Sequence, residues 1–145
     1  MLKAKFVMIV TVLVAGLACM SPAQEQKVEN TVEALEGLNY PQVARLARLG
    51  GRVVVRVKLD DAGKVVSASA MPSGRTQGVM VPDALSNAQK WRFRPNPGKE
   101  AVIIYEFRIE EYCTDFEIEH RVPSRFNFEV PNLVTVTACP LPVGG

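Results

Sequence analysis

The sequence predicts an α+β domain: an antiparallel sheet of about three strands with two short helices on one face, followed by a C-terminal β-hairpin. Three observations lead to this prediction. Residues 52–59 and 101–109 alternate apolar and polar side chains, as half-buried strands do. Two short stretches have helical spacing and end at Gly or Pro. Two further alternating runs close the chain, so the predicted order is α-β-β-α-β plus a strand pair.

The first predicted helix covers Pro41 to Leu49. Pro41 suits a first helical turn, where its missing N–H costs nothing. Gly50-Gly51 suits the end of a helix, because glycine readily takes positive φ. Arg45 and Arg48 are expected on the polar side of this helix.

A β-hairpin follows. In "RVVVRVKLD" one face is apolar, and Arg52, Arg56 and Lys58 form a basic row on the other. This row is expected to be a solvent-exposed charged face, and docking to an acidic partner is the alternative. A tight turn at residues 60–63 places Gly63 where the left-handed conformation is needed. Residues 64–71 return as the second strand.

The second predicted helix leads into the stretch "AQKWRFRPNPGK". Asp83 is expected to cap this helix, and Trp91 to fall on its apolar face. Trp91 and Phe93 are predicted core residues, whereas Arg92 and Arg94 are expected to be solvated. Prolines 95 and 97 end the element, so that the third strand can begin near Ala101.

The tail contains two further strands, "RFNFEV" at residues 125–130 and "LVTVTA" at 133–138. Pro131-Asn132 joins them, and Cys113 and Cys139 bracket them. In an oxidising compartment a disulfide between these cysteines is expected, closing a loop of about 25 residues. Two free thiols are the alternative. With His120, which is expected at the surface, the cysteines offer too few ligands for a metal site.

The N-terminus resembles a secretory signal peptide over residues 1–23. Lys3 and Lys5 precede the uncharged run "FVMIVTVLVAGLA", and Ser21-Pro22-Ala23 supplies small residues for cleavage. This predicts export to the periplasm. Lipidation at Cys19 and retention as an uncleaved anchor are the alternatives. The polar segment 24–39 is expected to form a short helix or to stay loose.

The charge balance excludes some classes of function. Removing Lys3 and Lys5 from the 17 basic residues leaves 15 against 15 acidic ones. A neutral domain gives no support for nucleic-acid binding. No nucleophile–base pair, metal signature or phosphate loop is present in the sequence, so no enzymatic activity, cofactor or small-molecule substrate is expected.

Residues 40–109 resemble the C-terminal domain of TonB, the energy transducer of Gram-negative outer-membrane transport. The resemblance rests on the order and spacing of short motifs rather than on any one of them. In chain order these are Tyr40-Pro41, Gly50-Gly51, Gly63, Ser73-Gly74, Asp83-Ala84, the run Trp91, Arg92, Phe93, Arg94 and Pro95, then Gly98 and Phe107.

The resemblance implies a periplasmic recognition module. Domains of this family add an extended segment of an outer-membrane receptor, the TonB box, to an open sheet edge, so that backbone groups supply the affinity. The family carries that edge on its last strand. The candidate binding residues are therefore Val102, Ile103, Ile104, Tyr105, Glu106, Phe107 and Arg108, and the expected partner is a receptor or another periplasmic protein segment.

Two departures from the family suggest a second hypothesis. The family's transducer has an uncleaved membrane helix and a long proline-rich spacer, which this sequence does not show before Tyr40. In addition, residues 110–145 have no counterpart in the family core. A tail hairpin at residues 125–138 would then occupy the last strand's edge, giving a self-capped structural or assembly module that acts through another surface or as a homodimer.

Overall fold

The computed structural model describes residues 30–72, 78–95 and 98–144. The predicted signal peptide and Cys19 lie outside the described residues. The elements in chain order are β1 (Val32–Ala34), α1 (Gln42–Leu46), β2 (Gly51–Leu59), β3 (Val65–Met71), the 3₁₀ turn η1 (Gly78–Met80), α2 (Val81–Ala88), β4 (Arg92–Phe93), β5 (Glu100–Ile109), α3 (Asp115–Glu119), β6 (Arg125–Glu129) and β7 (Leu133–Ala138).

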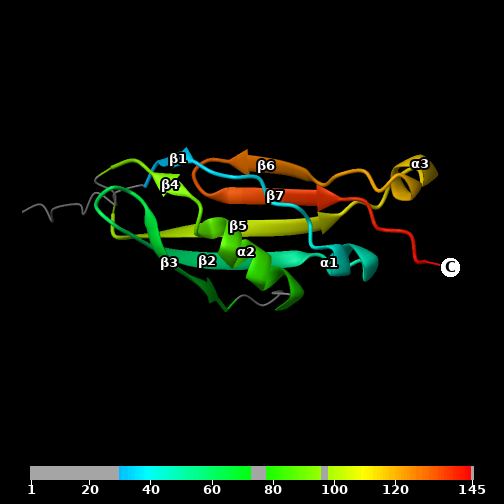
Figure 1. The fold of residues 1–145 in the computed structure, drawn as a ribbon, viewed down its shortest axis with the longest axis horizontal. Helices are drawn as coiled ribbons and strands as arrows, with labels where there is room; N and C mark the ends of the chain where they lie inside the picture. The colour runs from blue at the N-terminus through cyan, green and yellow to red at the C-terminus, as the bar shows by residue number, and fades with distance from the viewer. Residues whose placement is uncertain (1–29, 73–77, 96–97, 145) are drawn as a thin grey trace, which may run out of the picture.

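One five-stranded sheet forms the body of the molecule, in the order β3-β2-β5-β7-β6 (Figure 1). Neighbouring strands are antiparallel except β5 and β7, which run parallel. The α+β class is confirmed. The predicted tail hairpin is also present, but it joins the main sheet, so the sheet is mixed and larger than expected.

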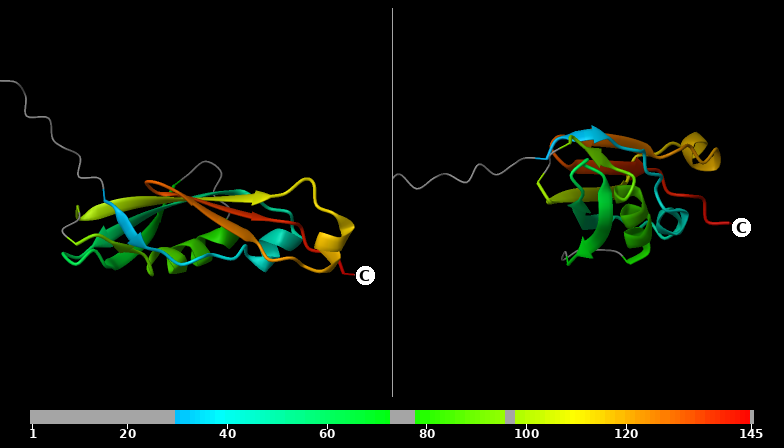
Figure 2. Two further views of the ribbon diagram at one scale, coloured as in Figure 1. Left: turned by 90° about the horizontal axis from the view of Figure 1, so that it is seen from above. Right: turned by 60° about the vertical axis from the view of Figure 1, so that its left-hand side comes forward.

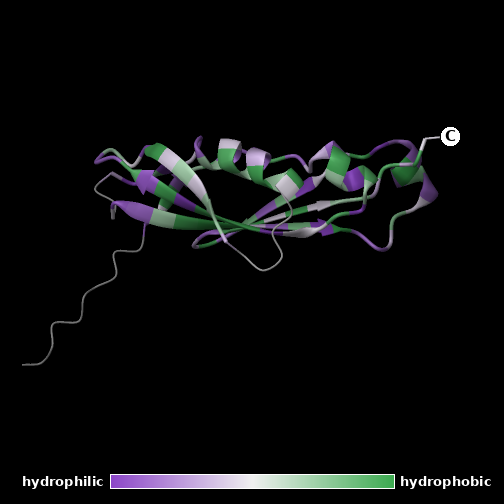
Figure 3. Cartoon of the chain, turned by 90° about the horizontal axis from the view of Figure 1, so that it is seen from below, coloured by the Kyte–Doolittle hydropathy of each residue, from purple (hydrophilic) through white to green (hydrophobic). Residues whose placement is uncertain are grey.

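The core lies between the sheet and the two helices α1 and α2, which cover one of its faces (Figure 2). Apolar and polar residues alternate along the strands, as Figure 3 shows. The alternation of β2 is confirmed, with its predicted apolar face buried and its basic residues exposed. The largest fully buried side chains are Trp91, Tyr105, Phe107, Met80, Ile103, Val53, Val55, Val57, Val134 and Val136.

The turn between β2 and β3 forms as predicted, with Gly63 at φ +83°. A Cβ at Gly63 would lie 2.1 Å from the backbone oxygen of Phe93, so a larger residue would not fit. The Asp60 carboxylate closes the turn by accepting hydrogen bonds from the backbone N–H groups of Ala62 and Lys64.

The first helix is shorter than predicted. It ends at Leu46, and the residue with positive φ is Arg48, at 54°, rather than Gly50 or Gly51. Gly50 has a different reason to be glycine, because a Cβ there would lie 2.9 Å from the backbone oxygen of Phe107. Close packing of this loop against β5, and not helix capping, therefore requires the glycine.

The predicted cap of the second helix is also wrong. α2 begins at Val81 with Met80 at the N-cap, and the Met80 side chain makes no capping hydrogen bond. Asp83 lies in the first turn, where its charge still favours the helix dipole. Ala84 and Ala88 are buried on the sheet side, as expected from the helical spacing.

The described part of the segment before Tyr40, residues 30–39, contains a short strand rather than the predicted helix. Val32–Ala34 forms β1, which pairs antiparallel with β4. The backbone N–H of Arg94 donates to the oxygen of Thr31 at 2.9 Å and extends this pairing. A third helix, α3, was not predicted either, although Thr114 and Glu117 form a capping box at its start.

Candidate protein-interaction site

The strand predicted to bind partners, β5, has the expected alternation of faces. Ile103, Tyr105 and Phe107 are buried against the helices, whereas Arg108 is exposed on the opposite face. Val102, Ile104 and Glu106 share that opposite face and are partly exposed. Antiparallel pairing with β2 runs from Gly51↔Phe107 to Lys58↔Glu100.

The expectation that β5 is an open edge is wrong, because β7 pairs with its other side. The parallel register runs from Ile104↔Leu133 to Ile109↔Ala138. This is the arrangement foreseen by the self-capped hypothesis, in which the tail hydrogen-bonds to the last strand. A chain that ended at Ile109 would leave this edge free, but the hairpin of residues 125–138 folds back onto it.

Beyond the ladder, side chains and loops bond several of the remaining groups on this side of β5. The Asn132 side chain donates to the oxygen of Val102 at 2.7 Å, and the Asn30 side chain donates to the oxygen of Glu100 at 2.7 Å. The N–H of Ile104 donates to the oxygen of Asn132 at 2.9 Å. The N–H of Glu110 donates to the oxygen of Ala138 at 3.0 Å, so the edge is occupied at both ends.

Apolar packing fixes the hairpin in place. Val134 and Val136 are fully buried, and Ala138 nearly so. From β6, the ring of Phe128 packs edge-on against Trp91 at a centroid distance of 5.5 Å. The hairpin is therefore part of the same core as the helices.

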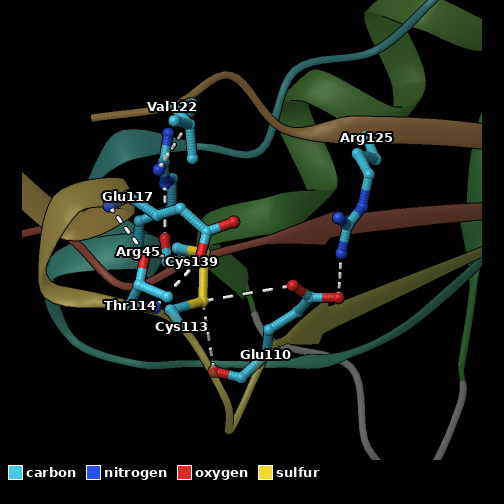
Figure 4. Close-up of a disulfide and its surroundings, with 8 residues drawn as sticks. All are labelled: Arg45, Glu110, Cys113, Thr114, Glu117, Val122, Arg125 and Cys139. Atoms are coloured by element: carbon cyan, nitrogen blue, oxygen red, sulfur yellow. Dashed lines mark hydrogen bonds and ion pairs between the residues drawn. A yellow bond between two sulfur atoms is a disulfide. The ribbon is translucent and has the colours of Figure 1, made fainter. Parts of the chain in front are cut away.

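Cys113 and Cys139 form a disulfide, as predicted, and it closes the end of the hairpin (Figure 4). Glu110 lies beside these sulfurs. Within the described residues these three side chains form the one group of His, Cys, Asp or Glu near enough to share a metal ion. Because the disulfide occupies both sulfurs, the group offers no thiolate to a metal.

Arg45, predicted on the polar side of the first helix, is buried and connects this helix to the tail. It is 7% exposed, and its guanidinium donates to the oxygens of Cys139 at 2.9 Å and Val122 at 3.0 Å (Figure 4). Burial lowers the pKa of Arg45, but an arginine remains protonated at neutral pH. Sequence reasoning missed this role, since helical spacing alone cannot show that a distant segment covers a polar position.

Asn87 is a polar residue in the centre of the core that sequence reasoning also missed. Its side-chain oxygen accepts from the indole N–H of Trp91 at 3.0 Å and from the hydroxyl of Tyr105 at 2.9 Å. Its NH₂ group donates to the backbone oxygens of Glu36 and Gly37. The four-residue spacing from Trp91 was the available signal, because a buried indole N–H needs an acceptor.

The remaining motif residues either pack in the core or lie at the ends of helices and strands. Tyr40 is buried, donates to the oxygen of Leu49 at 2.6 Å and packs edge-on against Phe107. Burial raises the pKa of Tyr40 to about 12 and raises the pKa of Tyr105 as well. Trp91 and Phe93 are buried, as predicted. Pro41 precedes α1, Gly51 opens β2, and Pro95 lies exposed after β4.

Charged residues gather on the outer face of the sheet, opposite the helices. Arg52 and Arg108 both pair with Glu106, and their hydrogen bonds lower the pKa of that carboxyl group. Arg56 and Lys58 lie further along β2 and are exposed.

Arg92, Arg94 and His120 are exposed, as expected. The ring of His120 stacks on Phe116.

No helix in the described part of the chain is long and apolar enough to cross a membrane. The structure is an α+β domain in which the predicted binding edge, on β5, is occupied by the chain's own C-terminal hairpin.

The comparison with known families identifies the domain. Residues 36–110 match the family described as Gram-negative bacterial TonB protein C-terminal, and the chain belongs to this family. Among solved structures it is similar to the solution NMR structure of the Pseudomonas aeruginosa TonB C-terminal domain, with 23% identity and a TM-score of 0.47. That match covers 61% of this chain and 95% of the other. No curated protein matches the chain.

Proposed function

We propose that this protein is a periplasmic, non-enzymatic protein-binding module that acts in or beside TonB-dependent outer-membrane transport. Its own C-terminal hairpin takes the place that the family resemblance assigns to the extended receptor segment. The parallel pairing of β7 with β5 carries this proposal. Family membership supports the transport setting. The signal-like N-terminal sequence supports export to the periplasm.

Strand addition needs a row of unpaired backbone N–H and C=O groups on the receiving strand. In this chain most of the outward groups of β5 already bond to Asn132, β7 and Asn30. A receptor segment that bound at Val102–Arg108 would first have to displace the hairpin and expose its buried valines. The intact protein therefore does not take up a TonB box on β5.

This arrangement favours a role without energy transduction through β5. A transducer must exchange its edge between free and receptor-bound states. Here a disulfide, a buried arginine and a shared core hold the edge closed. The protein's contacts with partners then depend on other surfaces of the domain.

Amide hydrogen exchange tests the proposal in the full, oxidised chain. The N–H groups of Ile104 and Glu110, which donate to the tail, should exchange slowly. A ten-residue TonB-box peptide from a receptor of the same bacterium should leave the chemical shifts of β5 unchanged. The matched control peptide has the same composition in scrambled order.

Rapid exchange at Ile104 and Glu110 would show that the hairpin leaves the edge open in solution. Peptide-induced shifts concentrated on Val102–Arg108, with the disulfide intact, would also overturn the proposal. In that case the binding site would be the β5 edge, as the family resemblance implies.

A further inference from the structure

β3 is an open edge of the sheet. It is the first strand in the order β3-β2-β5-β7-β6, and within the described residues no strand pairs with its outer side. Figure 1 shows β3 along one border of the sheet and β6 along the other. Four of its seven residues are exposed, including Val66 at 62%. The edge is therefore accessible to another chain.

The pairing registers show which backbone groups of β3 face outward. The N–H of Ile104 points to β7, so even-numbered residues of β5 face β7 and odd-numbered ones face β2. Tyr105 faces β2 and pairs with Val53, so odd-numbered residues of β2 face β5 and even-numbered ones face β3. Arg56 is one of these even-numbered residues, and it pairs with Ser69 of β3. Ser69 therefore bonds to β2, and Ala68 and Ala70 direct their N–H and C=O groups to solvent.

The two edge strands of the sheet, β3 and β6, differ in how well they are protected against pairing with another chain. β6 carries Arg125 and Glu129 and is followed by Pro131, and such residues discourage pairing with another chain. β3, with the sequence "VVSASAM", has neither a charge nor a proline. Of these two borders, β3 is the one suited to receiving a strand.

Two cations lie beside this edge. On the outer face, Arg56 pairs with Ser69 and Lys58 with Ser67 in the β2–β3 register. Neither cation forms an ion pair with another described residue, whereas Arg52 on the same strand pairs with Glu106. Serine is short, and neighbouring strands lie about 4.8 Å apart. The long side chains of Arg56 and Lys58 can therefore extend over the serines to a strand added at β3.

We propose that β3 binds an extended, acidic segment of a partner protein by strand addition. Backbone groups of Ala68 and Ala70 supply the pairing. Arg56 and Lys58 select Asp or Glu at alternate positions on the outer face of the added strand. This inference rests on the proposed protein-binding role and names its surface.

The charges favour an acidic partner over a second copy of this chain. Two copies paired through β3 would bring Arg56 and Lys58 of both copies to the same face of one continuous sheet. Like charges near each other oppose association, whereas an acidic strand neutralises them.

The test uses the full, oxidised chain, labelled with ¹⁵N, and two designed peptides. One has eight residues alternating Thr and Glu, and its matched control alternates Thr and Lys. The acidic peptide should shift the amides of β3, above all Ala68 and Ala70. The basic peptide should bind at least about tenfold more weakly, and added salt should reduce the difference.

Three variants separate charge from backbone pairing. The double variant Arg56→Glu, Lys58→Glu should bind the acidic peptide at least about tenfold more weakly and reverse the preference. Ala70→Pro should weaken both peptides. It removes an outward N–H without breaking the β2–β3 ladder, as proline at an edge does. Arg94→Glu, an exposed charge reversal outside β2 and β3, is the control and should leave both affinities unchanged.

The outcomes distinguish this inference from the proposed function. No binding, with Ile104 and Glu110 still protected from exchange, overturns the β3 site alone. Shifts on β5 instead of β3 overturn the self-capped edge as well. Concentration-dependent shifts on β3 without peptide, with a dimer in sedimentation velocity, would assign the edge to a second copy and overturn the acidic partner.

Discussion

At the scale of single residues, Asn87 shows how one polar side chain organises this core. It is 4% exposed and bonds two aromatic side chains and two backbone carbonyls. The indole N–H of Trp91 and the hydroxyl of Tyr105 would otherwise be buried without partners, and each unsatisfied group costs about 1–3 kcal/mol. A leucine of similar volume would fill the space but satisfy none of them.

Asn87→Leu should therefore lower the free energy of unfolding by about 2–4 kcal/mol. Urea denaturation followed by tryptophan fluorescence measures this directly, since Trp91 is the reporter and a bonding partner. Gln89→Leu makes the same change of chemistry at the exposed position after the helix. It should change stability by less than about 0.5 kcal/mol. Equal losses in the two variants would contradict the hydrogen-bonding role.

The buried tyrosines predict a loss of stability in alkaline solution. Burial raises the pKa of Tyr40 from 10.0 to about 12, so the folded state holds its proton more tightly than the unfolded state. This contribution is complete below pH 10 and is lost as pH rises from 10 to 12. Stability should fall in that window by up to about 1.4 kcal/mol per pH unit from this group. Tyr105 contributes with the same sign.

Unfolding midpoints in urea at pH 9, 10 and 11 check this dependence. Tyr40→Phe removes the titrating hydroxyl, so the variant should be less stable at pH 9 but lose less stability between pH 10 and 11. An equally steep decline in the variant would show that other groups cause the alkaline sensitivity.

At the scale of elements, β7 converts an edge strand into a central one. Its pairing with β5 satisfies backbone groups, and Val134 and Val136 fill the core beneath it. The disulfide lies at the end of this strand, since Cys139 comes immediately after β7 and is buried. Strand pairing, apolar burial and a covalent bond thus act on the same short segment.

Removing the disulfide tests how much the covalent bond adds. Cys113→Ser with Cys139→Ser should lower the free energy of unfolding by about 3 kcal/mol, because the bond closes a loop with a sequence separation of 26. The hydrogen-exchange protection of Ile104 should persist in this variant, since β7 still pairs with β5. Loss of that protection would mean that the disulfide alone keeps the edge closed.

At the scale of the whole molecule, the tail and the family region share one core. Arg45 bonds the tail from α1, Trp91 contacts Phe128, and the backbone N–H of Tyr40 donates to the hydroxyl of Ser124 at 3.1 Å. These contacts involve residues 40, 45 and 91 of the region that matches the family, residues 36–110. The tail therefore contributes to the stability of the domain.

A chain ending at Glu110 should be less stable than the full chain by more than about 3 kcal/mol, because it loses the burial of Val134 and Val136 and exposes part of Trp91. Thermal unfolding of both chains measures the loss. An unchanged midpoint would show that the tail is an independent appendage.

The sequence alone determined the strands of the main hairpin and the burial of their faces, but not the helix ends. Period-two patterns predicted β2 and the faces of β5, and Gly63 predicted its turn, because these depend on neighbouring residues. The order of short motifs identified the family. Only two cysteines follow the predicted signal peptide, so the disulfide between Cys113 and Cys139 could also be predicted.

Only the tertiary structure decided which strand edges are free. Alternation shows which face of a strand is buried, but it carries no information about which strand lies beside it. The pairing of β7 with β5, the burial of Arg45 and the bonds of Asn87 all join residues far apart in sequence. For the same physical reason, the sequence left two possibilities for β5, an open edge as the family resemblance implies or an edge occupied by the tail, and only the fold shows that β5 is covered and β3 is exposed.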